Sequence, residues 1–419
     1  MSPIHSVAVV PVPVGADVCA LLATLAPGDI ALLPAGDWPL ACVMTGGEVV
    51  EAGERTTLAP LDPQGPRPRL VPAADDQPVL TFVGPHLQVA GVDVLAPAVG
   101  PAMRSAGATD LRLVDVVLAG PGTLIELDGG SEIAIEAPGA VAGPGPLVVA
   151  DGVSDLSVVG GFIEGVGAVL DATASSVRVR DVFAVGGKGP LVKIADAVGP
   201  SFVEGCLLLS DGVALDVSDG AILVRNDILG GAEAALQVSG ADVRVLGVSV
   251  VATSEPGMAL DGVGEVASVL VSTHATWPEM TEGQVRSCGS PEACWLDVMA
   301  LDFRPVESWS GDGTSDDALD ADFCGDPRGS APTAGAVEPT GEGHPLVLEA
   351  KSSQPCGLPD LDRTAPEDFD TGVVVVDEPP VGCGACEGDG RAASSGAALT
   401  TLLLWSVAVG ARTRVVGGR

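Results

Sequence analysis

Charged side chains recur at one position of a repeated pattern in the middle of the chain. Glu136, Arg180, Glu204 and Arg225 each stand just before a small or turn-forming residue, in segments that alternate apolar and polar residues. Opposite charges on neighbouring strands stabilise one another by roughly 0.2–1 kcal/mol per pair, so an ion-pair ladder is the expected role of this column. The alternative is a saccharide-binding strip, in which charged groups bind sugar hydroxyl groups. That strip would comprise Arg178, Arg180, Lys193, Glu204, Arg225, Asp227 and Arg244.

Aromatic side chains, which could stack on sugar rings, are scarce in the same region. Residues 77–276 contain only Phe82, Phe162, Phe183 and Phe202, and we expect Phe183 to point into the core. This scarcity argues against both an enzyme and a lectin that acts on glycans, and it leaves binding through hydrogen bonds open. We predict no catalytic residue.

One acidic loop is a weak candidate for calcium. Residues 311–326 supply hard carboxylate oxygens, which calcium prefers. The loop does not match the EF-hand pattern, because Asp317 stands at its glycine position and Phe323 at its closing glutamate position. We therefore expect a solvated acidic loop and no cofactor. The candidate ligands are Asp312, Asp316, Asp320 and Asp322.

The nine cysteines lie mostly towards the two ends of the chain, with Cys206 alone in the middle. We expect Cys206 to be a small buried apolar residue. The others favour disulfides and hence an oxidising compartment, although sequence does not determine connectivity. A zinc site is the alternative, but no histidine has ligand spacing from a cysteine pair. The candidate pairs are Cys19 with Cys42, Cys288 with Cys294, and Cys324 with Cys356.

The overall composition excludes one class of function and indicates a class of fold. With 56 acidic and 20 basic side chains the net charge is −36, so binding to nucleic acid or to an anionic membrane by charge attraction is excluded. The chain has 56 Gly and 34 Pro but no Tyr, which favours many short strands around an aliphatic core.

A repeat of about 22 residues organises the middle of the chain, and each unit alternates apolar and polar residues around a bend. Because Gly, Asp and Asn adopt a left-handed backbone at low cost, their recurrence marks the bend. We predict a solenoid of about nine or more coils, each with two or three parallel strands. The bend column is Gly91, Asp115, Ala137, Gly160, Asp181, Gly205, Asn226, Gly247 and Ser268. A second column is Leu127-Asp128, Leu170-Asp171, Leu215-Asp216, Leu236-Gln237 and Leu260-Asp261.

These repeats resemble the right-handed parallel β-helix proteins, whose fold is shared with pectate lyases, over about residues 15–340. Residues 17–40 are similar to the opening of that family: Asp17 caps a short helix, and a strand follows at 30–33. The resemblance implies that the helix covers the open end of the solenoid. Residues 301–339 are similar to the terminal element of secreted β-helix proteins, with Asp302-Phe303-Arg304, Asp326-Pro327-Arg328 and Gly335-Ala336 fitting well.

Enzymes with this fold place acidic or basic residues on one sheet face, often with bound calcium. The repeats lack the Asp-Asp, Gly-His-Gly and Arg-x-Lys signatures expected of polygalacturonase-like enzymes. We therefore expect a structural, adhesive or glycan-contacting protein without catalytic activity. The alternative is a carbohydrate-active enzyme, a polysaccharide lyase or glycoside hydrolase of the pectate-lyase-like fold.

The C-terminal residues resemble the sorting signals of myxobacterial surface proteins. Cys383 and Cys386 precede an uncharged run at 397–410 and a tail with three arginines. The run is shorter than the roughly 20 residues of a stable membrane span, so we expect membrane contact only before the tail is processed. A weakly hydrophobic C-terminal helix of an intracellular protein is the alternative. Residues 1–15 make a poor signal peptide, because no Lys or Arg precedes a run that two prolines interrupt, and we expect the true start to lie upstream.

Together these features predict an extracellular protein attached to the outer membrane, whose partners are extracellular polysaccharide or cell-surface components. The expected divisions are a poorly defined N-terminus at 1–16, a cap with the first coils at 17–76, repeats at 77–276, an insertion with the exit element at 277–340, an acidic Pro-rich linker at 341–382 and the sorting signal at 383–419.

Overall fold

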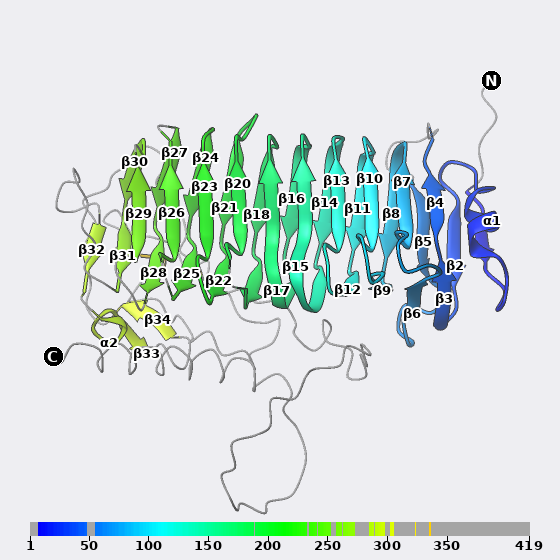
Figure 1. Ribbon diagram of the computed structural model, residues 1–419, viewed down its shortest axis with the longest axis horizontal. Helices are drawn as coiled ribbons and strands as arrows, with labels where there is room; N and C mark the ends of the chain where they lie inside the picture. Colours follow the sequence, from blue (N-terminus) through cyan, green and yellow to red (C-terminus); the bar gives the residue numbers. More distant parts are fainter. Residues whose placement is uncertain are drawn as a thin grey trace, which may run out of the picture. The chain divides into compact units, whose positions relative to one another are not determined.

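The chain divides into two units, Met1–Ala365 and Pro366–Arg419, and all residues described below belong to the first. The computed structural model describes residues 7–47, 55–187, 189–232, 234–240, 242–252, 257–261, 263–272, 285–288, 290–297, 302–305, 323 and 335–336. This part of the chain forms an all-β parallel solenoid of about 11 turns, which confirms the predicted fold class (Figure 1).

Sheet A is a 12-stranded sheet in which each turn contributes one strand, and every pairing within it is parallel. Its strands in order are β1 (Val9–Pro11), β2 (Ile30–Leu33), β5 (Thr56–Pro60), β8 (Pro85–Ala90), β11 (Thr109–Val114), β14 (Ser131–Glu136), β16 (Ser154–Val159), β18 (Val177–Arg180), β21 (Ser201–Glu204), β24 (Ile222–Arg225), β27 (Val243–Leu246) and β30 (Glu265–Ala267).

Sheet B has 20 strands, which stack in two parallel rows. Row B1 follows the bend of each turn: β3 (Gly36–Leu40), β6 (Pro68–Pro72), β9 (Asp93–Leu95), β12 (Val117–Ala119), β15 (Gly139–Asp151), β17 (Phe162–Thr173), β19 (Phe183–Val185), β22 (Leu207–Ser210), β25 (Ile228–Gly231), β28 (Ser249–Ala252), β31 (Val269–Val271) and β32 (Val285–Ser287). Row B2 leads to the next turn: β4 (Cys42–Thr45), β7 (Leu80–Val83), β10 (Met103–Ala106), β13 (Ile125–Asp128), β20 (Val192–Ala195), β23 (Leu215–Ser218), β26 (Leu236–Ser239) and β29 (Met258–Asp261). The long strands β15 and β17 belong to both rows.

The bend column lies where sheet A passes into row B1, and all nine of its predicted members have a positive φ. The φ values run from 48° at Ala137 to 67° at Gly160, which is the left-handed region. The sequence pattern therefore located one corner of every repeat correctly, because Gly, Asp and Asn occupy this region at low cost.

The predicted second column is wrong in part, because it mixes two registers. Leu170, Leu215 and Leu236 do lie in one column of row B2. Leu127 and Leu260 lie two residues further along the strand, since the first pairs with Ala150 and the second with Val238. The offset arises because the Leu-Asp dipeptide stands at two different positions along these strands: Ile125, not Leu127, is in register with Leu170.

One continuous cluster of buried Val, Leu, Ile and Ala side chains fills the interior along the solenoid. Cys206 is 0% exposed within this cluster, as predicted. Phe183 is also buried, but the expectation that it points inward is wrong: its neighbours Val182 and Ala184 belong to the core cluster, and Phe183 lies on the outer side of β19.

Short helices lie near both ends of the described solenoid. The predicted helix is present as α1 (Val18–Leu22), and the Asp17 carboxylate accepts a hydrogen bond from the Ala20 amide. Figure 1 shows α1 beyond β2, at the N-terminal end. Helix α2 (Pro291–Cys294) lies near the other end, and the antiparallel pair β33 (Trp295–Asp297) and β34 (Asp302–Pro305) follows it.

Candidate functional site

The predicted charged column lies on the outer face of sheet A, at the last residue of each strand before the bend. Glu136, Val159, Arg180, Glu204 and Arg225 occupy one register position on β14, β16, β18, β21 and β24. The predicted order of residues is therefore confirmed. The side chains point outward because the preceding residue in each strand, such as Val179 or Val203, belongs to the core.

Glu204 is the centre of this ladder, since it lies between two arginines. Its carboxylate is 2.7 Å from Arg225 Nη2 and 3.5 Å from Arg180 Nε. The side chains of Arg180 and Arg225 are 52% and 32% exposed, so solvent screens both pairs. The ladder neutralises repulsion between the two arginines while leaving their guanidinium groups accessible.

A second column runs beside the first and contains Arg178, Phe202, Leu223 and Arg244 on β18, β21, β24 and β27. Arg178 forms an ion pair of 3.4 Å with Asp155, and Arg244 one of 2.6 Å with Glu265. Phe202 and Leu223 are both partly exposed between the two arginines. Together the two columns define the sheet A strip: Arg178, Arg180, Phe202, Glu204, Leu223, Arg225 and Arg244.

Lys193 does not belong to this strip, contrary to the prediction. It lies on β20 in row B2, between Asp171 and Asp216 on the neighbouring strands. Its Nζ is 3.3 Å from the Asp171 carboxylate. Partial burial raises the pKa of Asp216, the charge of Lys193 opposes that rise, and the charge of Asp171 adds to it. This is a separate charged column on the other sheet.

Asp227 is also excluded from the strip, because it is 0% exposed inside the solenoid. It follows the bend residue Asn226, at the turn position that Cys206 and Val248 occupy in the neighbouring coils. Burial raises the pKa of Asp227 well above its ordinary value; a hydrogen bond from the Cys206 amide lowers it, and the charge of Glu204 raises it. A carboxyl group that is 0% exposed cannot bind an external ligand.

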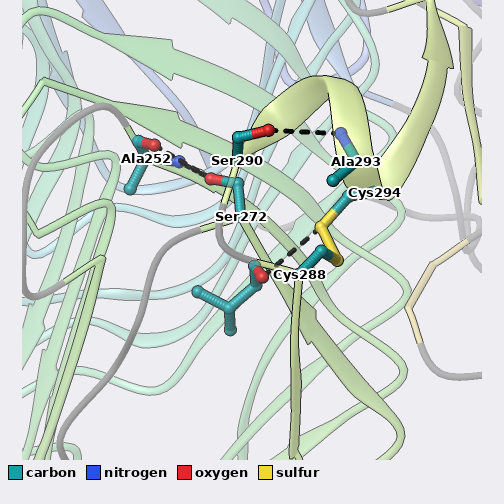
Figure 2. The surroundings of a disulfide bond; sticks show 7 residues. Ala252, Ser272, Cys288, Ser290, Ala293 and Cys294 are labelled. Carbon is teal, nitrogen blue, oxygen red and sulfur yellow. Dashed lines mark hydrogen bonds between the residues drawn. A yellow bond between two sulfur atoms is a disulfide. The ribbon is translucent and has the colours of Figure 1, made fainter.

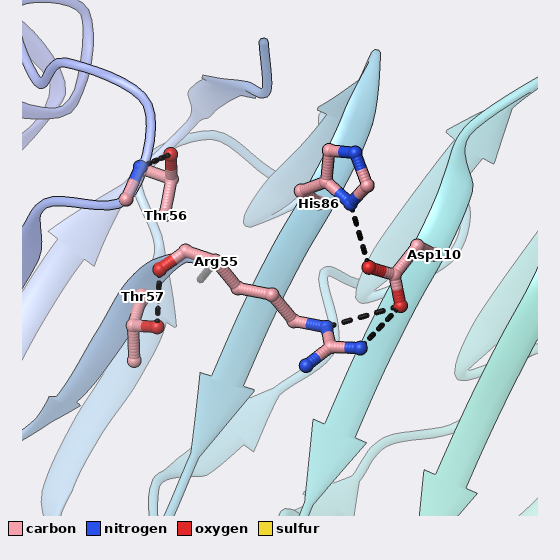
Figure 3. Close-up of polar contacts among 6 residues, drawn as sticks. Arg55, Thr56, Thr57, His86 and Asp110 are labelled. Carbon is pink, nitrogen blue, oxygen red and sulfur yellow. Dashed lines mark hydrogen bonds and ion pairs between the residues drawn. The ribbon is translucent and has the colours of Figure 1, made fainter. Parts of the chain in front are cut away.

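The structure also brings together a group of residues that the repeat pattern did not reveal. Figure 3 shows Arg55, which directly precedes β5, and His86 on β8 reaching Asp110 on β11. Arg55 Nη2 is 2.5 Å from Asp110 Oδ1, and His86 Nδ1 is 2.7 Å from Asp110 Oδ2. Burial alone would raise the pKa of Asp110, but the hydrogen bonds to His86 and Arg55 outweigh it and the pKa is lowered. Arg55 lies ahead of the aligned repeats, so spacing gave no signal for it.

A second such group surrounds Asp93 in row B1. Arg67 Nη2 is 2.7 Å from Asp115 Oδ1, and Arg67 Nη1 is 3.6 Å from Asp93 Oδ1. Burial raises the pKa of Asp93 to about 6; the charge of Arg67 opposes this rise and the charge of Asp115 contributes to it. Both groups tie consecutive turns of the solenoid together through buried or half-buried charges.

Two of the predicted cysteine pairs form disulfides, Cys19 with Cys42 and Cys288 with Cys294. Figure 2 shows the second bond beside α2, where Cys294 Sγ lies 3.4 Å from the Val271 carbonyl oxygen. Among the described residues, no group of three or more His, Cys, Asp or Glu side chains is arranged to hold a metal ion. The predicted residues outside the described part are Cys324, Cys356, Cys383, Cys386, Asp312, Asp316, Asp320 and Asp322.

No helix in the described ranges is both long and apolar enough to cross a bilayer. A comparison with protein families and with curated protein sequences found no match. Among solved structures, the chain is similar to a rhamnogalacturonan lyase, with 13% identity and a TM-score of 0.39 over 65% of this chain and 81% of that chain. It is also similar to a pectate lyase, with 13% identity and a TM-score of 0.39 over 79% of this chain and 96% of that chain.

Proposed function

We propose that this is a secreted β-helix protein attached to the cell surface, with a structural, adhesive or glycan-contacting role and no catalytic activity. The observation that carries the proposal is the sheet A strip. On four consecutive strands, β18, β21, β24 and β27, it presents guanidinium donors, a carboxylate acceptor and two partly exposed apolar side chains. Sugars offer hydroxyl groups and apolar ring faces to such a surface.

The electrostatics of the strip support binding rather than catalysis. Arg178, Arg225 and Arg244 are each paired with a carboxylate, and each is at least 32% exposed. A basic group that abstracts a proton from a sugar needs a pKa lowered towards the working pH by burial or by neighbouring positive charge. Paired and solvated arginines lack both features, but they can still donate hydrogen bonds to a ligand.

Two further observations support an extracellular location. The Cys19–Cys42 and Cys288–Cys294 disulfides are of a kind that persists in oxidising compartments. A net charge of −36 keeps a surface protein soluble and gives nucleic acid no attractive partner. In this proposal, attachment uses the segment with Cys383 and Cys386, and the partners are extracellular polysaccharides or other cell-surface components. Fractionation of cells that produce the protein tests this location.

A polysaccharide screen with the purified protein tests the binding role. The double variant Arg178→Ala/Arg244→Ala removes one guanidinium at each end of the strip, and we expect at least a tenfold loss of affinity for the polysaccharide that binds best. Arg104→Ala is the matched control, because Arg104 pairs with Glu126 on sheet B at a similar exposure. Equal affinity of both variants and the unmodified protein would show that the strip is not the binding surface.

The alternative function is a carbohydrate-active enzyme, and one observation favours it. Lys193 stands between Asp171 and Asp216 on three adjacent turns, so a basic group and two carboxylates share one exposed face. A calcium-dependent lyase would need such acids and a base. The test incubates the protein with acidic and neutral polysaccharides, with calcium or with a chelator, and measures unsaturated and reducing ends. Product that disappears in Lys193→Ala would overturn the non-catalytic proposal.

A further inference from the structure

The outer face of row B1 carries apolar side chains that point away from the core. In β19, β22 and β25 the core residues are Ala184, Leu208 and Leu229, so the neighbouring residues of each strand face outward. We call these outward residues the outer apolar row: Phe162, Phe183, Leu207, Ile228 and Leu270, with Ser249 between the last two.

The outer apolar row faces outward, yet every member except the partly exposed Phe162 is covered. Phe183 and Leu207 are 1% exposed, and Ile228 and Leu270 are 0% exposed. Outward apolar residues on sheet A behave differently, since Phe202 remains partly exposed. Phe183 stacks on Phe162 at a centroid distance of 5.0 Å, but a stacked neighbour on the same face does not exclude solvent from above. Another part of a protein must therefore lie over this row.

Gly335 and Ala336 lie over one end of the outer apolar row, at Ser249 and Leu270. The Ala336 amide donates a hydrogen bond of 2.9 Å to Ser249 Oγ, and the Gly335 amide donates one of 2.6 Å to the Ser268 carbonyl oxygen. A Cβ on Gly335 would lie 2.8 Å from Ser249 Oγ and 3.1 Å from Leu270 Cβ, so the backbone rests directly on the row. Both Gly335 and Ala336 are buried.

The chain that leads to Gly335 is long enough to cover the rest. From Leu270 to Phe183 the covered part of the row spans four strand spacings, or about 19 Å. Residues 306–334 follow β34 and could span about 95 Å when extended, which allows them to run along the row and return. They offer Val306, Trp309 and Leu319 for apolar contact, and many acidic residues for solvent. We propose that residues 306–340 lie along the outer apolar row and cover it within the same chain.

This proposal is independent of the glycan-binding function, and it assigns residues 306–340 to the folded body of the protein. Photo-crosslinking of the full chain tests it. Benzoylphenylalanine is placed at Phe183, and in a matched control at Phe202 on sheet A, and the products are mapped by mass spectrometry. We expect Phe183 to crosslink within the chain to peptides from 306–340, and the probe at Phe202 to give none of these products. Crosslinks from Phe183 to a second copy or to other peptides, or none at all, would overturn the proposal.

A second measurement avoids any change to the solenoid. Gly335 has a φ of 99°, a conformation that strains residues with a side chain, and an added methyl group would strike Ser249 and Leu270. We expect Gly335→Ala to speed limited proteolysis within 306–340 at least tenfold while the circular dichroism of the solenoid stays unchanged. Proteolysis at the original rate would count against the proposal.

Discussion

The backbone amide of Cys206 donates a hydrogen bond of 2.7 Å to Oδ1 of Asp227 in the interior of the solenoid. The backbone of the next residue continues this contact, because the Ile228 amide donates a hydrogen bond to the Cys206 carbonyl oxygen. The neighbouring coils have apolar residues such as Val182 and Val248 at this turn position, so Asp227 replaces a core side chain with an acid. That acid accepts a hydrogen bond from one buried amide, and burial raises its pKa well above the ordinary value.

We predict that Asp227→Asn stabilises the protein at neutral pH. Burial raises the pKa of Asp227, so the folded chain keeps a proton that the unfolded chain loses above about pH 4. In the unmodified protein the stabilising contribution of protonated Asp227 is therefore complete below that pH. As the pH rises further, the free energy of unfolding falls by about 1.4 kcal/mol for each pH unit until the folded-state pKa is reached. Asparagine still accepts the Cys206 amide but does not ionise. Urea unfolding of both proteins between pH 4 and pH 8 measures the difference.

Asp219→Asn is the matched control for this prediction. Asp219 is exposed, and its φ of 51° suits asparagine as well as aspartate. Because the substitution keeps the size and the backbone preference of an exposed residue, we expect it to change the free energy of unfolding by less than about 0.5 kcal/mol. A difference between Asp227→Asn and the unmodified protein that stays constant with pH would show that Asp227 does not titrate on unfolding.

Asp93 makes a second pH-dependent contribution to the free energy of unfolding, over a narrower pH range than Asp227. Burial raises its pKa to about 6, so its contribution to stability is fully present below about pH 4 and is lost as the pH rises towards 6. Asp93→Asn removes this dependence and is expected to stabilise the protein by up to roughly 3 kcal/mol above pH 6. Thermal unfolding at pH 4, 5, 6 and 7 measures it. A gain that continues to grow well above pH 7 would contradict the assignment to Asp93.

The ladder on sheet A predicts unequal coupling for the two arginines beside Glu204. Arg225 is 2.7 Å from Glu204 and Arg180 is 3.5 Å away and more exposed. We expect double-mutant cycles with Glu204→Gln to give a coupling of about 0.5–1 kcal/mol for Arg225→Gln, and less for Arg180→Gln. Both values should fall in 1 M salt, where the screening length is about 3 Å. Equal couplings that salt does not change would contradict an electrostatic ladder.

The sequence predicted the parts of this fold that backbone geometry imposes on every turn. The bend column was recognisable because a positive φ restricts the residue types, and the ladder through Glu204 followed from counting back from that bend. Lys193, Asp227 and Phe183 were misplaced because the alternation of inward and outward residues restarts after each bend. Spacing within one strand does not determine which face the next strand presents. The pairing of Arg55 with Asp110 was missed because those residues lie 55 positions apart, outside the repeat period.

The bend column itself yields a prediction about Ala137, which has a φ of 48°. A left-handed backbone costs a residue with a Cβ about 1–2 kcal/mol, whereas glycine adopts it freely but loses about 0.5–1 kcal/mol in chain entropy. Ala137→Gly should therefore stabilise the protein by up to about 1 kcal/mol. Ala134→Gly is the control, because Ala134 lies within β14, where glycine relieves no strain and only increases the chain entropy lost on folding. Thermal melts should move in opposite directions for the two variants, and a loss of stability in both would show that the bend is not strained at Ala137.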